Sequence, residues 1–85
     1  MVAIRPDLLS ELGQLFRRHR LLHKKIQIEV AGAVGISQPS YSAYECGDAL
    51  PTVPVFLALL QELDIPLSEV MALLPKDDEP NGVAA

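Results

Sequence analysis

The sequence predicts an all-α fold, a compact bundle of five helices in one small domain. Apolar residues recur three and four positions apart along five segments, which is typical of amphipathic helices. Glycines and prolines separate these segments, and none shows the alternation of apolar and polar residues expected of a strand. The chain has 85 residues, 49% of them hydrophobic, which is enough for one packed core.

The first helix is predicted from about Leu8 to His23, with Asp7 or Ser10 as a candidate cap. Gly13 weakens a helix by about 1 kcal/mol relative to alanine, so we expect it at a close crossing of two helices. The predicted apolar stripe consists of Leu8, Leu12, Leu15, Phe16, His19 and Leu22.

Residues 27–47 are predicted to form a short helix, a tight turn and a second short helix. Gly35 ends the first helix because glycine adopts the left-handed conformation without steric cost. Ser37 is a good N-cap for the second helix, and Pro39 falls in its first turn, where a missing N–H removes nothing. The first helix has an apolar stripe of Val30, Ala31 and Val34.

The second short helix has two different faces. Tyr41 and Tyr44 lie on one side, whereas the other side is small and polar, with Gln38, Ser42 and Ala43. This is the spacing of a helix-turn-helix, whose second helix can lie in the DNA major groove.

The sequence resembles the phage-repressor/Cro-like (XRE) family, which has a lambda-repressor-like fold. The resemblance extends from about Leu12 to Leu74 and is carried by Gln27, Ala31, the Gly35-Ile36-Ser37 turn, Glu45, Gly47 and Pro51. Family members usually carry Gly-Leu-Thr/Ser before the glutamine. Here those positions are Lys24-Lys25-Ile26, with neither a capping glycine nor a capping hydroxyl.

The resemblance implies a DNA-binding transcriptional regulator that represses from a palindromic operator as a homodimer. It assigns base contacts to Gln38, Ser42 and Ala43, and a glutamine at the start of that helix can make bidentate contacts to adenine. Backbone contacts are expected from Gln27, Lys24, Lys25 and Ser40. Arg20 and Glu45 align with a family pair that often forms an internal salt bridge, for which we expect a structural role.

Two further helices are predicted, over about Val53–Leu63 and Leu67–Leu74, separated by Asp64-Ile65-Pro66. The last helix has more apolar residues than its own core contact requires. Its candidates for a dimer interface are Leu67, Val70, Met71 and Leu74. The predicted organisation is a flexible lead over 1–7, the helix-turn-helix domain over 8–74, and a disordered acidic tail over 75–85.

Charge is distributed unevenly, and this leaves a second function open. The net charge is −4, but the first 25 residues carry six basic and two acidic residues, whereas the rest carries one lysine and nine acids. Family members often have Lys or Arg after the recognition helix, where this chain has Asp48. Together with Ile26 and Ile28 on a face expected to be exposed, this supports an alternative, a helix-turn-helix redirected to a protein partner such as another regulator or a toxin.

Other classes of function find little support in the sequence. No Gly-rich phosphate loop or nucleophile motif indicates an enzyme, and no cofactor is expected. His19 and His23 have the spacing of a helical metal pair but no third ligand, so we interpret His19 as a packed core histidine and expect no metal. Cys46 has no basic neighbour and is expected to be inert. No run of about 20 apolar residues predicts a membrane span, and no signal pattern is present, so a cytoplasmic protein is expected.

Overall fold

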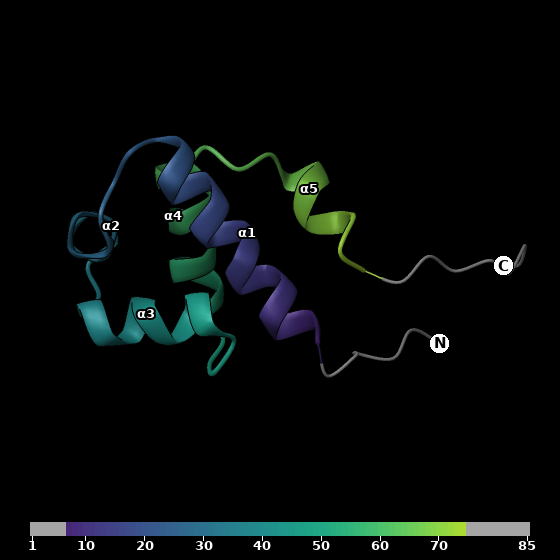
Figure 1. The fold of residues 1–85 in the computed structure, drawn as a ribbon, viewed down its shortest axis with the longest axis horizontal. Coiled ribbons are helices and arrows are strands. Elements are labelled where there is room, and N and C mark those ends of the chain that lie inside the picture. The colour runs from purple at the N-terminus through teal and green to yellow at the C-terminus, as the bar shows by residue number, and fades with distance from the viewer. Residues whose placement is uncertain (1–6, 75–85) are drawn as a thin grey trace, which may run out of the picture.

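The computed structural model describes residues 7–74, and these form five α-helices and no strand. The helices are α1 (Leu8–Leu22), α2 (Gln27–Val34), α3 (Gln38–Cys46), α4 (Val53–Glu62) and α5 (Leu67–Met71). The predicted all-α, five-helix fold is therefore confirmed (Figure 1). Residues 1–6 of the predicted lead, and the whole predicted acidic tail, lie outside the described residues.

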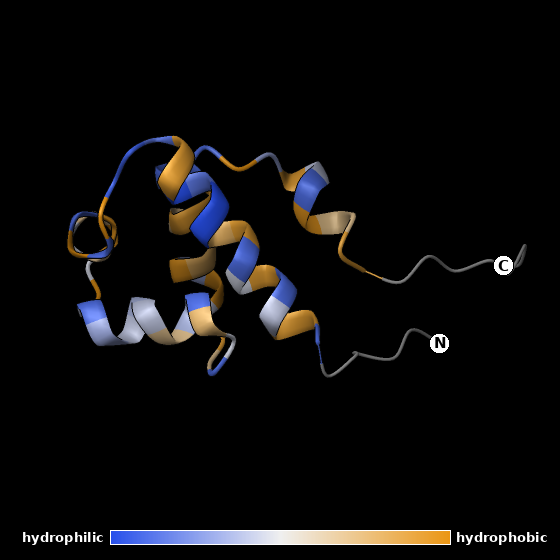
Figure 2. Cartoon of the chain, in the orientation of Figure 1, coloured by the Kyte–Doolittle hydropathy of each residue, from blue (hydrophilic) through white to orange (hydrophobic). Residues whose placement is uncertain are grey.

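The core lies where α1, α2, α3 and α4 meet. The long helix α1 packs on α3, and α2 packs on both α3 and α4. Figure 2 shows polar and apolar residues alternating along α1, whereas α4 behind it is almost wholly apolar. The rings of Phe16 and Phe56 meet edge to face with centroids 6.3 Å apart, a favourable aromatic geometry. The buried core consists of Leu15, Phe16, Val30, Ala31, Tyr41, Leu59, Leu63 and Ile65.

The ends of the two central helices follow the predicted turn chemistry. Gly35 and Gly47 both have φ of 78° and end α2 and α3 in the left-handed conformation. Lys24, at φ 57°, adopts this conformation after α1 without being a glycine. The start of α2 lacks a capping hydroxyl, and there the Ile26 N–H donates to the Glu29 carboxylate at 2.9 Å instead.

Three helix boundaries differ from the prediction. Helix α1 ends at Leu22, which is 69% exposed and lies outside the apolar stripe to which it was assigned. Helix α4 ends at Glu62, one residue early. Helix α5 ends at Met71 rather than at Leu74, because the chain tightens there into three-residue turns, with the Leu74 N–H donating to the Met71 carbonyl at 3.1 Å.

Gly13 lies at the expected close crossing, where α1 meets the C-terminal end of α3. A Cβ atom added at Gly13 would overlap the backbone carbonyl oxygens of Tyr44 and Glu45. These are backbone atoms, which cannot move aside as a flexible side chain can. The two helices therefore approach this closely because the residue at the crossing has no side chain.

Replacing Gly13 with alanine is expected to destabilise the fold. The added methyl group must push α1 away from α3, and overpacking of this kind costs about 1–3 kcal/mol despite the better helix propensity of alanine. Gly32→Ala is the matched control, because a Cβ there meets open space. That substitution is expected to stabilise the helix by about 0.5–1 kcal/mol. Urea unfolding of the two variants measures both effects, and equal midpoints would contradict the assigned crossing.

Candidate nucleic-acid interface

Helices α2 and α3 form the helix-turn-helix, and backbone bonds fix the turn between them. In Figure 1, α2 is seen end-on while α3 runs across below it, so the two helices are steeply inclined. The Ile36 N–H donates to the Ala31 carbonyl at 2.9 Å, which closes α2. The Ser37 hydroxyl accepts from the Ser40 N–H at 3.2 Å and caps α3, as the sequence predicts.

Helix α3 has one face in the core and one facing solvent. Tyr41 and Glu45 are buried and hold the helix against the rest of the domain. On the opposite side Ser40 is exposed, and Ser42 and Ala43 are half-buried. The small polar face that the sequence assigns to DNA is therefore open within the single chain.

Arg20 of α1 and Glu45 of α3 form a salt bridge in the interior. Arginine Nε donates to Glu45 Oε2 at 2.6 Å, and a terminal N–H donates to Oε1 at 3.1 Å, the two-pronged geometry of strong arginine–carboxylate pairs. The side chains are only 11% and 4% exposed. A third guanidinium N–H donates to the Lys25 carbonyl at 3.0 Å, so Arg20 also holds the segment that leads into α2.

Hydrogen bonds continue from this pair to the surface of α3. The Gln27 Nε2 group donates to Glu45 Oε1 at 2.9 Å, and the Gln38 Nε2 group donates to Gln27 Oε1 at 2.7 Å. Each amide Nε2 carries two hydrogens, so both glutamines keep one for an external contact, and Gln38 keeps its carbonyl oxygen as well. The structure thus brings together four of the residues singled out from the sequence.

The charge state of Glu45 is set by these contacts. Burial raises the pKa of the carboxyl, but the hydrogen bonds from Arg20 and Gln27 outweigh it, so the pKa lies below its usual value. The hydrogen bond to Glu45 raises the pKa of Arg20 in return, against the effect of burial. Burial and then Glu45 raise the pKa of Tyr41, whose hydroxyl is buried beside the pair. At neutral pH the site therefore holds an ionised Arg20–Glu45 pair and a neutral tyrosine.

The two lysines before α2 lie in different surroundings. Lys24 is exposed. The Lys25 ammonium instead donates to the Glu62 carboxylate at 2.7 Å and to the Glu62 carbonyl at 3.1 Å, at the C-terminal end of α4. A cation at the C-terminal end of a helix binds a backbone carbonyl oxygen and is attracted to the negative end of the helix dipole. Lys25 consequently joins α2 to α4, a contact that the sequence analysis did not foresee.

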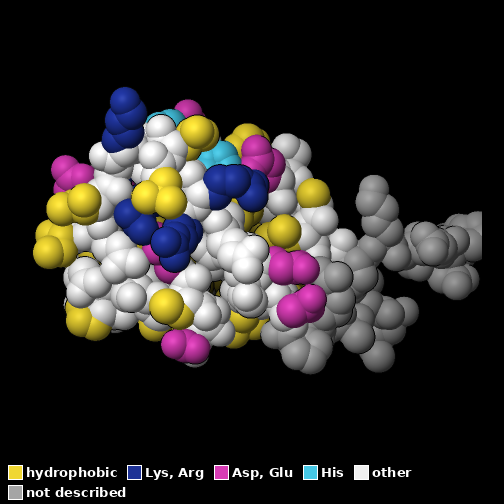
Figure 3. All heavy atoms as spheres, viewed as in Figure 1, with side chains coloured by type: hydrophobic (Ala, Val, Ile, Leu, Met, Phe, Trp, Pro, Cys, Tyr) yellow, Lys and Arg dark blue, Asp and Glu magenta, His cyan; other side chains and the backbone are white. Residues whose placement is uncertain are grey.

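Basic side chains form a loose group on one face of the molecule. In Figure 3 the dark-blue side chains lie over the upper left and centre of the viewed face, with acidic side chains scattered around them and two side by side toward the lower right. Arg17, Arg18 and Lys24 are exposed basic residues. Just after the C-terminal end of α3, Asp48 is exposed, so that end of the helix carries a negative charge.

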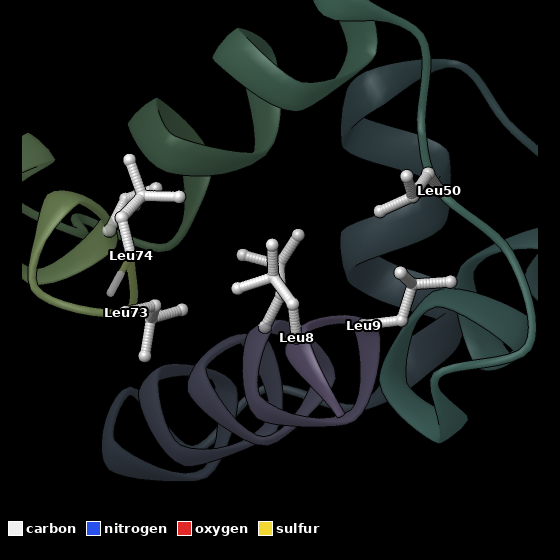
Figure 4. Close-up of a pocket in the computed structure, with 7 residues that line it drawn as sticks. Leu8, Leu9, Leu50, Leu73 and Leu74 are labelled. Atoms are coloured by element: carbon white, nitrogen blue, oxygen red, sulfur yellow. The ribbon is translucent and has the colours of Figure 1, made fainter. Parts of the chain in front are cut away.

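The predicted dimer residues of the last helix fall into two groups. Leu67 and Met71 are 58% and 56% exposed, and Leu74 beyond the helix is exposed as well, whereas Val70 packs against the core. Beside them lies an apolar groove of about 150 Å³. Figure 4 shows Leu73 and Leu74 facing the same space as Leu8, with Leu9 and Leu50 across from them. The groove is lined by Leu8, Leu9, Leu12, Leu50, Val70, Leu73 and Leu74.

His19 is a packed histidine, as interpreted from the sequence. It is buried on α1, and its Nε2 lies 2.8 Å from the Glu69 carboxylate of α5. Within residues 7–74 no group of three His, Cys, Asp or Glu side chains is placed to hold a metal ion. In the same residues, no helix has the length and apolar character to cross a bilayer.

The sequence analysis missed several polar contacts, among them Gln27 to Gln38, Lys25 to Glu62 and His19 to Glu69. The first had a usable signal, because both glutamines begin a helix of the same helix-turn-helix. The other two join residues 37 and 50 positions apart and depend on how α4 and α5 fold back on the rest. No local pattern indicates them.

The turn, the buried tyrosine face and the open polar face define a helix-turn-helix DNA-binding domain. The chain belongs to the helix-turn-helix family (HTH_3) of the XRE type, whose family model matches residues 16–70. This is a family of DNA-binding transcriptional regulators rather than a class of enzymes. The predicted family and its coarse function are thereby confirmed. No match to a protein of curated function is found.

Solved structures of controller proteins have a similar fold. The restriction-modification controller protein C.AhdI from Aeromonas hydrophila is 26% identical, with a TM-score of 0.67, over 78% of this chain and 98% of that one. A point mutant of the restriction-modification controller protein C.Esp1396I gives 17% identity and a TM-score of 0.67 over 78% of this chain and 86% of that one. A second point mutant of C.Esp1396I gives 16% identity and a TM-score of 0.67 over 86% of this chain and 89% of that one. At such identities the C.Esp1396I structures support the fold alone.

Stability is expected to fall in acid partly through Glu45. The pKa of Glu45 in the folded state lies below the unfolded-state value of about 4.3. Its contribution to the free energy of unfolding is therefore complete above that value and is lost as the pH falls through the folded-state pKa. Glu45→Gln keeps a similar shape without the charge, so it should be less stable at pH 7 and lose less on acidification. Urea unfolding between pH 2 and 7 measures this, and parallel curves for the two proteins would refute it.

Proposed function

We propose that this protein is a sequence-specific DNA-binding regulator that represses transcription by covering a promoter. Helix α3 lies in the major groove, and α2 spans the DNA backbone. The observation that carries this proposal is the hydrogen-bonded series from the buried Glu45 through Gln27 to Gln38. It holds a glutamine amide in a defined orientation at the open start of α3, where base readout requires one.

Base contacts are assigned to Gln38, Ser42 and Ala43. With one N–H bound to Gln27, Gln38 still offers an N–H and a carbonyl oxygen, the pair needed for adenine N7 and N6. Ser42 supplies a hydroxyl that bonds to a base edge, and Ala43 supplies a methyl group that contacts thymine methyl. Both are partly accessible one turn further along the helix.

Backbone contacts are assigned to Gln27, Lys24 and Ser40. The free N–H of Gln27 and the N-terminus of α2 both suit a phosphate oxygen. Ser40 is exposed, and its oxygen accepts from the Ser37 hydroxyl at 2.9 Å, which leaves the Ser40 O–H free to donate to a phosphate oxygen. Lys25 is given a structural role instead, because Glu62 already holds its ammonium. DNA as a ligand fits the cytoplasmic location expected from the sequence.

A homodimer on a palindromic operator completes the proposal. One domain offers few phosphate contacts, and a symmetric pair doubles them over half-sites about 34 Å apart. The exposed Leu67 and Met71, together with Leu74 and the neighbouring apolar groove, support α5 as the surface that pairs. The likeness to C.AhdI, which this chain covers almost fully, supports control of restriction-modification genes as the regulated process.

Gln38→Ala is expected to relax base preference. Losing a bidentate contact should cost about 1–3 kcal/mol on the preferred operator and little on unrelated duplexes. Lys24→Ala should instead weaken binding to all duplexes about equally. It should also make the affinity less dependent on salt concentration, by the equivalent of about one phosphate contact. Gln61→Ala, at an exposed glutamine of α4, is the control. Selection of bound duplexes from a random pool, followed by titration at two salt concentrations, measures these effects. An unchanged preference in Gln38→Ala would exclude its proposed role.

Met71→Asp is expected to convert the dimer to monomers without unfolding the domain. The side chain is exposed in the single chain, so the new charge is costly only if a second subunit buries it. Val53→Asp, at an exposed apolar position at the start of α4, is the control and should leave the dimer intact. Sedimentation equilibrium distinguishes the states. If both variants dimerise equally well, the assignment of α5 to the dimer interface is contradicted.

The alternative is a protein partner in place of DNA, and exposed apolar residues favour it. Ile26 and Ile28 are exposed at the start of α2, beside positions assigned to the DNA backbone. Together with Asp48 they make that surface less suited to phosphate than in a typical family member. No enrichment of any sequence from the random pool at low salt, with a folded protein, would favour this alternative over DNA binding.

A further inference from the structure

Helix α5 is attached to the domain by few contacts. It has five residues, none of them fully buried, and its apolar contact with the core is made by Val70 and, just beyond the helix, Leu73. A helix of this length has no stability of its own in water. Its conformation and direction are therefore set by whatever fastens it to α1.

One side chain supplies the polar part of that attachment. Glu69 Oε1 lies 2.8 Å from His19 Nε2 and 3.3 Å from an Arg18 terminal nitrogen, so one carboxylate oxygen joins α5 to two successive residues of α1. These are the only side-chain hydrogen bonds found between α5 and the remainder of residues 7–74. Leu67 and Met71 lie four residues apart on the face of α5 that stays exposed, whereas the Glu69 carboxylate reaches α1.

We propose that Glu69 is a positioning residue for subunit assembly, which fixes α5 on α1 so that Leu67, Met71 and Leu74 form one preorganised apolar surface for a second copy of this chain. The inference rests on the proposed homodimer and adds to it the residue that orients the interface. Without this contact, α5 must be ordered at the moment of association, and that ordering weakens binding.

The chemistry of the contact makes it directional. His19 is buried, and with an ionised Glu69 its Nε2 must be the donor. Its Nδ1 is buried and has no partner among the described residues, so the ring has one bonded orientation. The hydrogen bond from His19, more than the Arg18 contact, holds the pKa of Glu69 below its usual value. Glu69 is thus charged and bound to α1 throughout the neutral range.

Orientation of α5 also has consequences for the groove and for DNA. Val70, Leu73 and Leu74 form the α5 side of the apolar groove, so a displaced α5 opens it. In a symmetric dimer the direction of the pairing helix sets the distance between the two recognition helices, and that distance must match the half-site spacing. Loosening α5 should therefore weaken operator binding more than binding to a single half-site.

Glu69→Ala and Glu69→Gln test the inference, with Asp64→Asn as the charge-matched control. Asp64 is exposed with φ of 56°, a conformation that asparagine tolerates, so its variant removes one charge without moving α5. Sedimentation equilibrium gives the dimer dissociation constant, and amide hydrogen exchange reports each helix separately. Glu69→Ala should raise the dissociation constant at least tenfold and speed exchange in α5 alone. Glu69→Gln keeps an acceptor for His19 and should recover most of the loss.

The outcomes separate the inference from the proposal on which it rests. If the unaltered protein stays monomeric at all concentrations, the homodimer fails, and exchange in α5 still decides whether Glu69 holds that helix. If the unaltered protein dimerises and Glu69→Ala dimerises equally well, the inference is overturned while the homodimer stands. Faster exchange in all five helices would also overturn it, because Glu69 would then be a general stabilising residue.

Discussion

The buried pair of Arg20 and Glu45 is the constraint on which the rest of the domain depends. A carboxylate that is 4% exposed is tolerated only with a fixed cation and further donors around it. Arg20 of α1, Gln27 of α2 and the Lys25 carbonyl before α2 all bind within this one cluster. Three helices are thereby held in one arrangement, and losing either charge would leave the other buried and unpaired, at a cost of about 3–5 kcal/mol.

The same cluster links the interior to the surface that we assign to DNA. Glu45 faces the core from α3, yet its second oxygen binds Gln27, which in turn binds Gln38 at the open start of the same helix. A surface glutamine normally samples several rotamers, whereas here two successive hydrogen bonds restrict one amide. Preorganisation of this kind lowers the ordering cost of a base contact, because less rotamer freedom is lost on binding.

The sequence was sufficient for the fold because its signals are local. Capping by Ser37, left-handed glycines at 35 and 47, and apolar stripes at helical spacing each act within a few residues, and each was found as predicted. Leu22 and the end of α5 were placed wrongly because periodicity alone does not show where tertiary contacts stop supporting a helix. The site was less predictable, since whether Lys25 faces DNA or α4 depends on a contact with Glu62, which is distant in sequence.

The proposed DNA interface has few unpaired positive charges, which is why dimerisation should matter so much for this protein. Arg20 is paired with Glu45 and Lys25 with Glu62, so neither brings an unpaired charge to a phosphate. At the other end of α3 the exposed Asp48 would repel a DNA backbone. Apart from Lys24, the residues assigned to DNA in a single domain are neutral, and neutral hydrogen bonds add little net affinity because they replace hydrogen bonds to water. In the proposed homodimer, affinity comes from two such domains acting on one duplex, and the distance between them is set by how firmly the short helix α5 is held in place.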